Sequence, residues 1–275
     1  RGLTYSESSN SHGIEAVDKV TDSTGEVIFS TGGCNIMAPV VEGSYGKSSG
    51  LHGISAVSLV SASHGETLSA VSANRGITVE SGTVVASRGI SAGGSGIYAD
   101  SVNDSQGVST GSSENTSHGI EACRKVTDSE GRSTHATGGC GIKSDMVTGS
   151  YGFAAGGQGI NGQHPQFGAR LVINSYGETT KAMYNGHGIR SHHTVGSYGF
   201  VNVSGGGNGI TSWSVSSSAG YAVAGAGEAI FADLATHSMA TRNNDESGTM
   251  AIHSFRGVGC LSLGGENISQ KYDMP

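Results

Sequence analysis

The sequence predicts an all-β protein that folds as a parallel β-solenoid (β-helix) with repeats of about 20–22 residues. Three observations support this prediction. A long stretch is duplicated, short glycine-containing motifs recur along most of the chain, and 275 residues include 47 glycines but only 3 prolines. Because each glycine destabilises a helix by about 1 kcal/mol relative to alanine, this composition favours short strands joined by turns.

The duplication relates residues 11–46 to residues 117–152. The two stretches align without a gap at an offset of 106 residues, and 22 of the 36 aligned positions are identical. The offset corresponds to about five of the shorter repeats. In a solenoid each repeat is too small to bury its own apolar face, so neighbouring repeats must stack.

The shorter repeat is marked by two alternating motifs, Gly-Ile and Ser-x-Gly. The Gly-Ile pairs begin at Gly13, Gly53, Gly76, Gly89, Gly96, Gly119, Gly141, Gly159, Gly188 and Gly209. The Ser-x-Gly motifs begin at Ser44, Ser63, Ser105, Ser129, Ser150, Ser175 and Ser197.

A small residue often lies two positions after the isoleucine, as Ala56 follows Ile54 and Ala122 follows Ile120. A spacing of two places both side chains on one face of a strand. We therefore expect an inward row of isoleucines, with coils that rise by about 4.8 Å. We expect the glycines at strand edges, where a sharp turn needs a positive φ angle.

The number of chains in the core is open from the sequence. Val, Ile, Leu, Met and Phe together number 58, which is few for a core that one chain must fill alone. Three chains wound around a common axis would share one core, so the composition favours a homotrimer, although repetition also fits a single-chain solenoid. We expect residues 1–220 to form the repeat shaft and residues 221–275, where the pattern loosens, to form an irregular capping or tip region.

Charge and hydropathy exclude some functions. The formal net charge of −7 provides no basic patch for nucleic acid. The chain also lacks a run of about eighteen apolar residues, so membrane insertion is not expected.

Two catalytic patterns occur within the glycine-rich background. Gly157, Gly159 and Gly162 fit the dinucleotide-binding fingerprint, and the stretch 46–50 fits G-x-S-x-G. Neither has the expected strand–turn–helix setting, so we interpret both as repeat turns. The sequence predicts no catalytic residue and no cofactor.

Histidine and cysteine are the residue types in this chain that could form a metal or redox site. The one local concentration of histidines, His187, His192 and His193, is a candidate transition-metal site, and the favoured alternative is that they are solvated turn residues. Cys34 and Cys140 occupy the same repeat position about 24 Å apart along the axis, which excludes a disulfide between them. We interpret the four cysteines as small buried hydrophobes.

A polysaccharide-cleaving site would need paired carboxylates and aromatic platforms. Acidic residues are sparse, and Asp22 and Asp128 lie in the duplicated V-T-D-S turn, where an Asp side chain can bond its own backbone. Trp213 is the only tryptophan. A hydrolase or lyase is therefore an alternative function and not the main prediction.

The repeats SHGIEA, GSYGFAAGGQGI and SHGETLSAVSANRGI resemble the shafts of phage tail fibres and tailspikes. They are similar also to the β-roll heads of trimeric autotransporter adhesins. The half-units here run about ten or eleven residues, in contrast to the regular fourteen of the autotransporter pattern. The resemblance implies an elongated trimeric attachment fibre on a cell or virion surface, without a cofactor.

Together these observations predict a structural and adhesive fibre protein, extracellular or on a virion surface. The expected partners are further copies of the chain and a cell-surface glycan or protein receptor. The alternatives are a polysaccharide-cleaving tailspike on the same scaffold and a filament subunit that assembles end to end through open strand edges.

Overall fold

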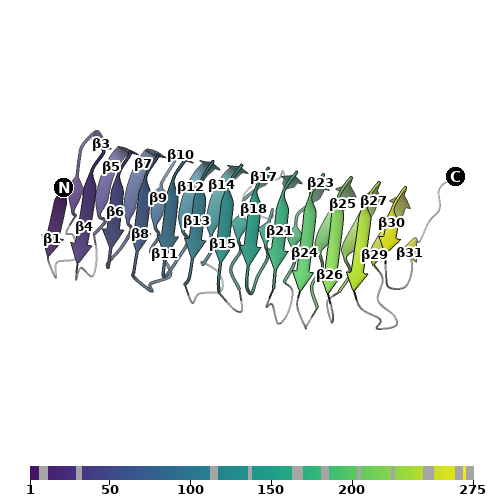
Figure 1. Ribbon diagram of the computed structural model, residues 1–275. Helices are drawn as coiled ribbons and strands as arrows, with labels where there is room; N and C mark the ends of the chain where they lie inside the picture. The colour runs from purple at the N-terminus through teal and green to yellow at the C-terminus, as the bar shows by residue number, and fades with distance from the viewer. Residues whose placement is uncertain are drawn as a thin grey trace. The chain divides into compact units, whose positions relative to one another are not determined.

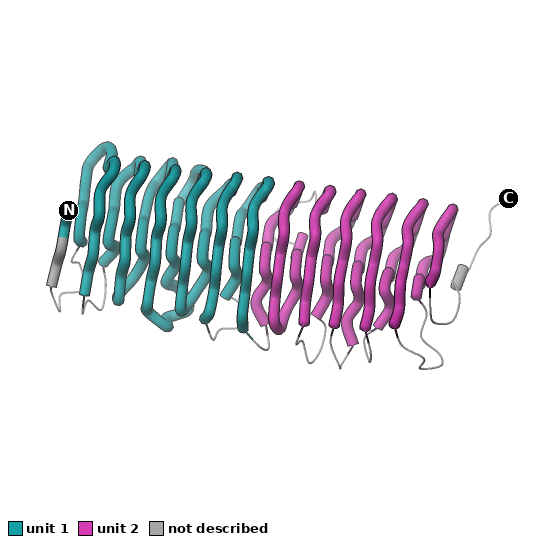
Figure 2. Tube along the Cα trace, in the orientation of Figure 1, with its two compact units in different colours: residues 1–135 teal, residues 136–275 magenta. Residues whose placement is uncertain are grey.

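The computed structural model describes residues 1–5, 12–28, 33–111, 117–135, 138–162, 170–180, 186–202, 206–223, 227–243, 251–263 and 269–270. They fall into two compact units, residues 1–135 and 136–275 (Figure 2). Each unit is a parallel β-solenoid with turns of about 21 residues (Figure 1). The described part of the chain contains strands and turns but no helix.

In unit 1, every coil contributes one strand to a sheet that we call sheet A and one or two strands to a second sheet, sheet B. Sheet A of this unit contains β1 (Gly2–Tyr5), β4 (Thr24–Ile28), β6 (Tyr45–Ser48), β8 (His64–Thr67), β11 (Arg88–Ser91), β13 (Gln106–Ser109) and β15 (Glu130–Ser133). Sheet B contains β2 (Ile14–Glu15), β3 (Lys19–Thr21), β5 (Ile36–Glu42), β7 (Ile54–Ser61), β9 (Ile77–Val79), β10 (Thr83–Val85), β12 (Ile97–Asn103) and β14 (Ile120–Thr127).

Unit 2 is built in the same way. Its part of sheet A contains β18 (Tyr151–Ala154), β21 (Tyr176–Thr179), β24 (Tyr198–Asn202), β26 (Ala219–Val223), β28 (Met239–Asn243) and β30 (Leu261–Leu263). Its part of sheet B contains β16 (Ile142–Lys143), β17 (Met146–Thr148), β19 (Ile160–Asn161), β20 (Leu171–Ile173), β22 (Ile189–Arg190), β23 (His193–Val195), β25 (Ile210–Ser216), β27 (Ile230–Thr236), β29 (Ile252–Val258) and β31 (Ser269–Gln270).

The strands of each sheet pair in parallel, and equivalent residues of the repeat are paired, although the register of sheet B shifts at Ala38/Val40 and at Ala99/Ser101. In sheet B, Ile54 pairs with Ile77, which pairs in turn with Ile97. In sheet A, Gly46 pairs with Gly65, which pairs in turn with Gly89. Equivalent positions of the repeat therefore form straight rows along each unit.

The predicted inward row of isoleucines is confirmed. These side chains are completely buried: Ile36, Ile54, Ile77, Ile97 and Ile120 in unit 1, and Ile142, Ile160, Ile189, Ile210, Ile230 and Ile252 in unit 2. The alanines two positions later, such as Ala56 and Ala122, are buried on the same face. The row includes isoleucines that Gly-Ile pairs do not mark, since Asn35 precedes Ile36 and Ala229 precedes Ile230.

One predicted member of the row is wrong. Gly89-Ile90 lies in β11 of sheet A, where Gly89 is the glycine of a Ser-x-Gly motif and Ile90 points outward and is half-buried. The dipeptide Gly-Ile alone does not show to which sheet a strand belongs. Ser87, two positions before Gly89, marks the strand as one of sheet A.

The role predicted for most of the motif glycines is also wrong. They do not adopt positive φ angles; they allow the two sheets to approach until their backbones touch. A Cβ atom added to Gly65 would overlap the carbonyl oxygen of Gly76 on the opposite strand and would lie 2.7 Å from Cγ1 of Ile77. Gly46, Gly107, Gly152 and Gly177 meet the opposite sheet in the same way.

The residue directly before each Ser-x-Gly motif makes the sharp turn between the sheets, and His237 before Ser238 and Gly259 before Cys260 do the same at the equivalent position. These residues have positive φ angles of 44–60°, and most of them are not glycine: Asp22, Gly43, Ala62, Ala86, Asp104, Asp128, Gly149, Asn174, Gly196, Ser217, His237 and Gly259. Asp and Asn tolerate this conformation better than other side chains. The Asp of the V-T-D-S turn is therefore a corner residue.

The serines that follow these turn residues form a hydrogen-bonded row along each unit. In unit 1, the backbone N–H of Ser44 donates to Oγ of Ser63 at 3.1 Å, and the N–H of Ser63 donates to Oγ of Ser87 at the same distance. Each hydroxyl in turn donates to a carbonyl two residues earlier, as Ser63 does to Ser61 at 2.7 Å. Unit 2 repeats this pattern from Ser150 to Ser238.

Backbone contact between the sheets explains the low apolar content without a second chain. Glycine occupies one inward position of most sheet A strands, and a mostly small residue such as Ser48 or Thr67 occupies the other, so the isoleucine, alanine and valine rows of sheet B fill most of the core of each coil. The thin composition that favoured three chains sharing one core is thus accounted for within a single chain. Residues 230–243 and 251–263 continue the same register, and a capping or tip role for residues 221–275 stays a prediction.

Replacing Gly46 by Ala tests the contact between the sheets. The added methyl group would overlap the Gly53 carbonyl oxygen and lie 3.0 Å from Cγ1 of Ile54. We expect a loss of about 1–3 kcal/mol of unfolding free energy, because both neighbours belong to a packed core. Urea unfolding followed by circular dichroism measures the effect. The control is Lys47→Ala, on the outer face of the same strand, and an equal shift in both variants would contradict the claim.

Asn35 is expected to destabilise unit 1. Its side chain is completely buried, and neither its Nδ2 nor its Oδ1 has a hydrogen-bond partner. Asn35→Ala, which copies Ala229 at the same repeat position, should raise the unfolding free energy by about 1–2 kcal/mol by removing these groups. Asn208→Ala should have the opposite effect, because the Asn208 side chain bonds Glu228 and Thr211. A destabilised Asn35→Ala variant would contradict the account.

Candidate functional site

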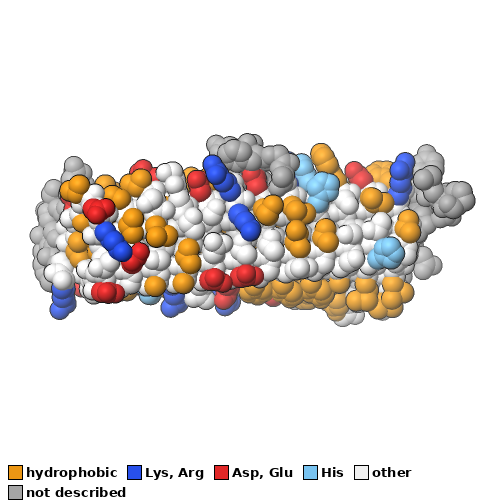
Figure 3. Space-filling model, turned by 90° about the horizontal axis from the view of Figure 1, so that it is seen from above, with side chains coloured by type: hydrophobic (Ala, Val, Ile, Leu, Met, Phe, Trp, Pro, Cys, Tyr) orange, Lys and Arg blue, Asp and Glu red, His pale blue; other side chains and the backbone are white. Residues whose placement is uncertain are grey.

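The outer face of sheet A in unit 2 carries most of the large aromatic side chains of the described chain. The first and third residues of each sheet A strand point outward, as the alternation of partly exposed and buried positions shows. In unit 2 half of these positions are aromatic, and we call the following residues the aromatic ladder: Tyr151, Phe153, Tyr176, Tyr198, Phe200 and Tyr221. This face lies along the lower edge of Figure 3, where hydrophobic side chains gather in the right half of the view.

The rings of the ladder stack on one another from coil to coil. The ring centres of Tyr176 and Tyr198 lie 5.1 Å apart with planes 7° from parallel, and those of Tyr151 and Tyr176 lie 5.3 Å apart at 24°. Phe200 and Tyr221 stack at 5.4 Å and 11°. The constant register causes this, because it repeats each position at about the spacing that stacked rings prefer.

Two tyrosine hydroxyls of the ladder, those of Tyr176 and Tyr198, have raised pKa values. The pKa of Tyr176 is raised to about 12, because its surroundings desolvate the hydroxyl and the carboxylate of Glu178 lies nearby. The pKa of Tyr198 is raised for the same main reason. The hydroxyl of Tyr151 donates to Oε2 of Glu178 at 2.9 Å. The face thus presents ring edges and neutral hydroxyls around one carboxylate.

The same repeat positions in unit 1 are mainly charged or polar. Lys47, Glu66 and Arg132 replace the aromatic residues at the third strand position, and Tyr45 donates a hydrogen bond to Glu66 at 3.2 Å. Beyond the ladder in unit 2 the apolar character continues, since Met239 and Leu261 are 41% and 54% exposed. The outer face of sheet A in unit 2 therefore differs from that in unit 1 in its side chains and not in its backbone.

A smaller aromatic cluster lies on sheet B of unit 2. Trp213 is 60% exposed, and its ring stacks on His192 at a centre-to-centre distance of 4.0 Å with planes 8° apart. Nη1 of Arg170 lies 2.7 Å from Nε2 of His192. The pKa of His192 is lowered, first by desolvation and then by Arg170 and His193.

The three histidines predicted as a metal site are not brought together as one. Among the described residues, no group of three His, Cys, Asp or Glu side chains is placed to hold a metal ion. Nδ1 of His187 accepts the backbone N–H of Asn208 at 3.1 Å, His192 faces Arg170, and His193 is exposed in β23. One ring nitrogen of His187 and one of His192 therefore already have partners within the protein.

His187 belongs to a structural row instead. His12, His52 and His187 lie two residues before the inward isoleucine, and each accepts the backbone N–H of the next coil through Nδ1 at 3.0–3.1 Å. Asn208 makes the same bond through Oδ1 to Glu228 at 2.9 Å. Burial lowers the pKa of His52 and of His187 to about 4, with a smaller effect of Arg75 and Arg190 respectively. These histidines are not the solvated turn residues that the sequence favoured.

All four cysteines are free. The interpretation as buried hydrophobes holds for Cys34 and Cys140 and is wrong for Cys123 and Cys260, which are partly exposed. The pKa of Cys34 is raised by burial. Gly157 and Gly159 approach backbone of the neighbouring strands, and the stretch 46–50 covers β6 and the turn after it, without a helix in either place.

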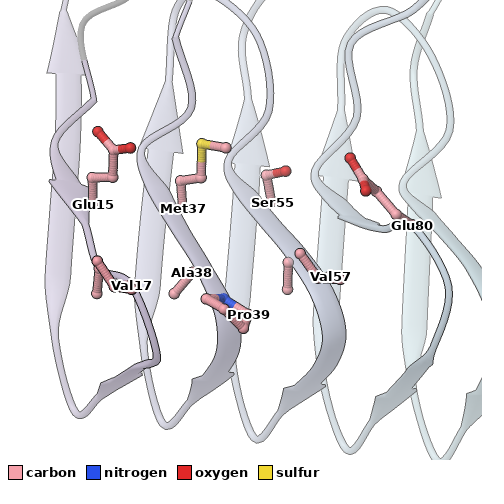
Figure 4. A pocket seen from close by; sticks show the side chains of 10 residues that line it. Glu15, Val17, Met37, Ala38, Pro39, Ser55, Val57 and Glu80 are labelled. Atoms are coloured by element: carbon pink, nitrogen blue, oxygen red, sulfur yellow. The ribbon is translucent and has the colours of Figure 1, made fainter.

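Unit 1 contains an open groove on the outer face of sheet B (Figure 4). Its volume is about 240 Å³, and side chains from four successive coils line it. The walls are mainly aliphatic, with Glu15 in the first coil and Glu80 in the fourth.

No protein-family model, curated protein or solved structure matches the chain. Within the described residues, none of the segments forms an apolar helix of membrane-spanning length.

The aromatic ladder was missed at the level of sequence, although a signal existed. Tyr151, Tyr176 and Tyr198 each precede the glycine of a Ser-x-Gly motif. Once the register is known, residues at the same repeat position of successive coils must lie next to one another. The groove had no comparable signal, because it depends on how the chain bulges between Ala38 and Val40.

The stability of the protein should fall between pH 6.5 and pH 4 because of the buried histidines. The unfolded pKa of histidine is about 6.5 and the folded pKa of His187 is about 4, so its contribution is complete above pH 6.5 and is lost as the pH falls. One such site should lose about 2 kcal/mol by pH 5. Unfolding midpoints measured from pH 8 to pH 5 test this.

His187→Asn should flatten the pH dependence at this site, because Asn208 shows that an asparagine oxygen can accept the same bond. His193→Asn is the control, since this side chain is exposed in β23. An unchanged pH profile in His187→Asn would show that His187 does not carry the effect.

Proposed function

We propose that the protein is a structural and adhesive fibre module whose aromatic ladder is an attachment surface. The observation that carries the proposal is the largely apolar outer face of sheet A in unit 2, where the aromatic ladder, interrupted by Glu178, is followed by Met239, Leu261 and Leu263. Exposed apolar side chains gathered on one face in this way typically mark an interaction site. The rigid, regular backbone beneath it fits a role as a scaffold that presents side chains.

The stacking of the ladder favours a protein receptor over a glycan. A sugar ring packs on the open face of an aromatic ring, but the Tyr176 ring is covered on both faces by Tyr151 and Tyr198. Only ring edges and hydroxyls point outward. A flat partner surface with apolar groups and hydrogen-bond acceptors complements this arrangement.

An extracellular or virion-surface location and a homotrimer are parts of the same proposal. The resemblance to trimeric fibres is the support for the trimer. Each unit has its own core, so the composition no longer calls for other chains to fill it. The mass in solution tests it, since one chain weighs 27.6 kDa. A species of about three times that mass supports the trimer, and a species of one chain's mass contradicts it.

The attachment surface is tested with Phe153→Lys/Phe200→Lys. Both residues occupy the strand position at which unit 1 carries Lys47 and Arg132, so the fold should accept lysine there. We expect at least a tenfold loss of retention on isolated bacterial cell envelopes, because two charges would interrupt the apolar face. Retention of the labelled protein is measured by fluorescence.

The matched control is Ile90→Lys/Val108→Lys, which introduces the same charges at the same repeat position of unit 1. Equal loss in both double variants, or no retention of the unmodified protein, would contradict the proposal. Oligosaccharide released from the envelopes would instead support the polysaccharide-cleaving alternative, and indefinite rods in negative-stain micrographs would support the filament alternative.

A further inference from the structure

The groove of unit 1 is an apolar channel with a carboxylate at each end. Val17, Met37 and Val57 contribute aliphatic side chains that are 98%, 41% and 48% exposed. Figure 4 shows these side chains from successive coils, with Glu15 at one end and Glu80 at the other. The exposed apolar surface is thus bounded by negative charge.

The shape of the groove follows from the repeat. Ala38 and Ala56 point into the core and leave little bulk at the surface, and the register shifts between Ala38 and Val40. The following residues therefore bulge outward and form one wall. Pro39 lies in this bulge, and its carbonyl accepts a hydrogen bond from Ser58 of the next coil at 2.9 Å.

Lys19, which is exposed on the same face of sheet B, is already paired. Nζ of Lys19 lies 2.7 Å from Oε2 of Glu42. Neither Glu15 nor Glu80 takes part in an ion pair given for the described residues, and both are exposed. The groove therefore has an uncompensated negative charge at each end, which complements a cationic ligand.

We propose that the groove binds an extended cationic segment of a partner protein. In this segment one basic residue lies before an aliphatic residue and one lies after it. Glu15 and Glu80 are three coils apart, or about 14 Å along the axis, and Glu80 lies two repeat positions further along its coil. An extended chain rises about 3.3 Å per residue and points alternate side chains to one face. Residues i, i+2 and i+4 of the form basic, aliphatic, basic would place the two charges at the two carboxylates and the aliphatic group between them.

This inference goes beyond the proposed attachment role and does not depend on it. It concerns sheet B of unit 1, whereas the aromatic ladder lies on sheet A of unit 2. The small volume of about 240 Å³ suits single side chains and not a folded element. Binding is therefore expected to be weak and to decrease with salt.

The test uses the full chain and a fluorescent peptide, Ser-Lys-Ser-Val-Ser-Lys-Ser. Saturable binding by fluorescence anisotropy is expected, with about a fivefold loss of affinity in Glu15→Gln/Glu80→Gln. Glu66→Gln/Glu130→Gln, which removes the same charge from sheet A, should bind within twofold of the unmodified protein. Val17→Ser/Val57→Ser should also weaken binding, and Val17 is too exposed for its loss to disturb folding.

Three results would overturn the proposal. One is an absence of saturable binding to the unmodified protein. Another is equal affinity for a control peptide with serine in place of valine. The third is a concentration-dependent dimer that is lost in Val17→Ser/Val57→Ser, which would make a second copy of the chain the occupant.

Discussion

The structure depends on direct contact between the backbones of its two sheets. Sheets that pack through side chains lie about 10 Å apart. Here the glycine of each Ser-x-Gly motif removes the side chain at the point of contact, so that Gly65 meets the carbonyl of Gly76 and the side chain of Ile77. One row of isoleucine, supported by alanine and valine, then fills the coil, and the serine row closes the corner through hydrogen bonds.

Contact between the two sheets restricts the residue types that can occupy the inward positions of the repeat. It does not restrict the residue types at the outward positions. The outer face of sheet A carries lysine, glutamate and arginine in unit 1 and an aromatic ladder in unit 2, on the same backbone. Function in such a protein is therefore read from the outer rows. Stacked rings such as Tyr176 and Tyr198 give an apolar surface with little conformational freedom to lose on binding.

The sequence was sufficient for the fold class and for most of the core, because the two-residue spacing of Ile54 and Ala56 and the repeat length are local properties. It was not sufficient for the role of the glycines, since a glycine at a turn and a glycine at a close contact look alike in a sequence. Ile90 was assigned to the wrong sheet for the same reason. His187 was read as a possible ligand because its partner, the N–H of Asn208, comes from the next coil.

The most direct test of the account is the separation of the two sheets in an atomic-resolution crystal structure. Contact between backbones predicts that the Cα of Gly65 lies about 3.3–3.6 Å from the carbonyl oxygen of Gly76, the distance of a Cα–H···O contact. The same distance is expected at the equivalent glycines of each coil. A separation of these two glycines that is wide enough to admit a side chain between them would contradict the account.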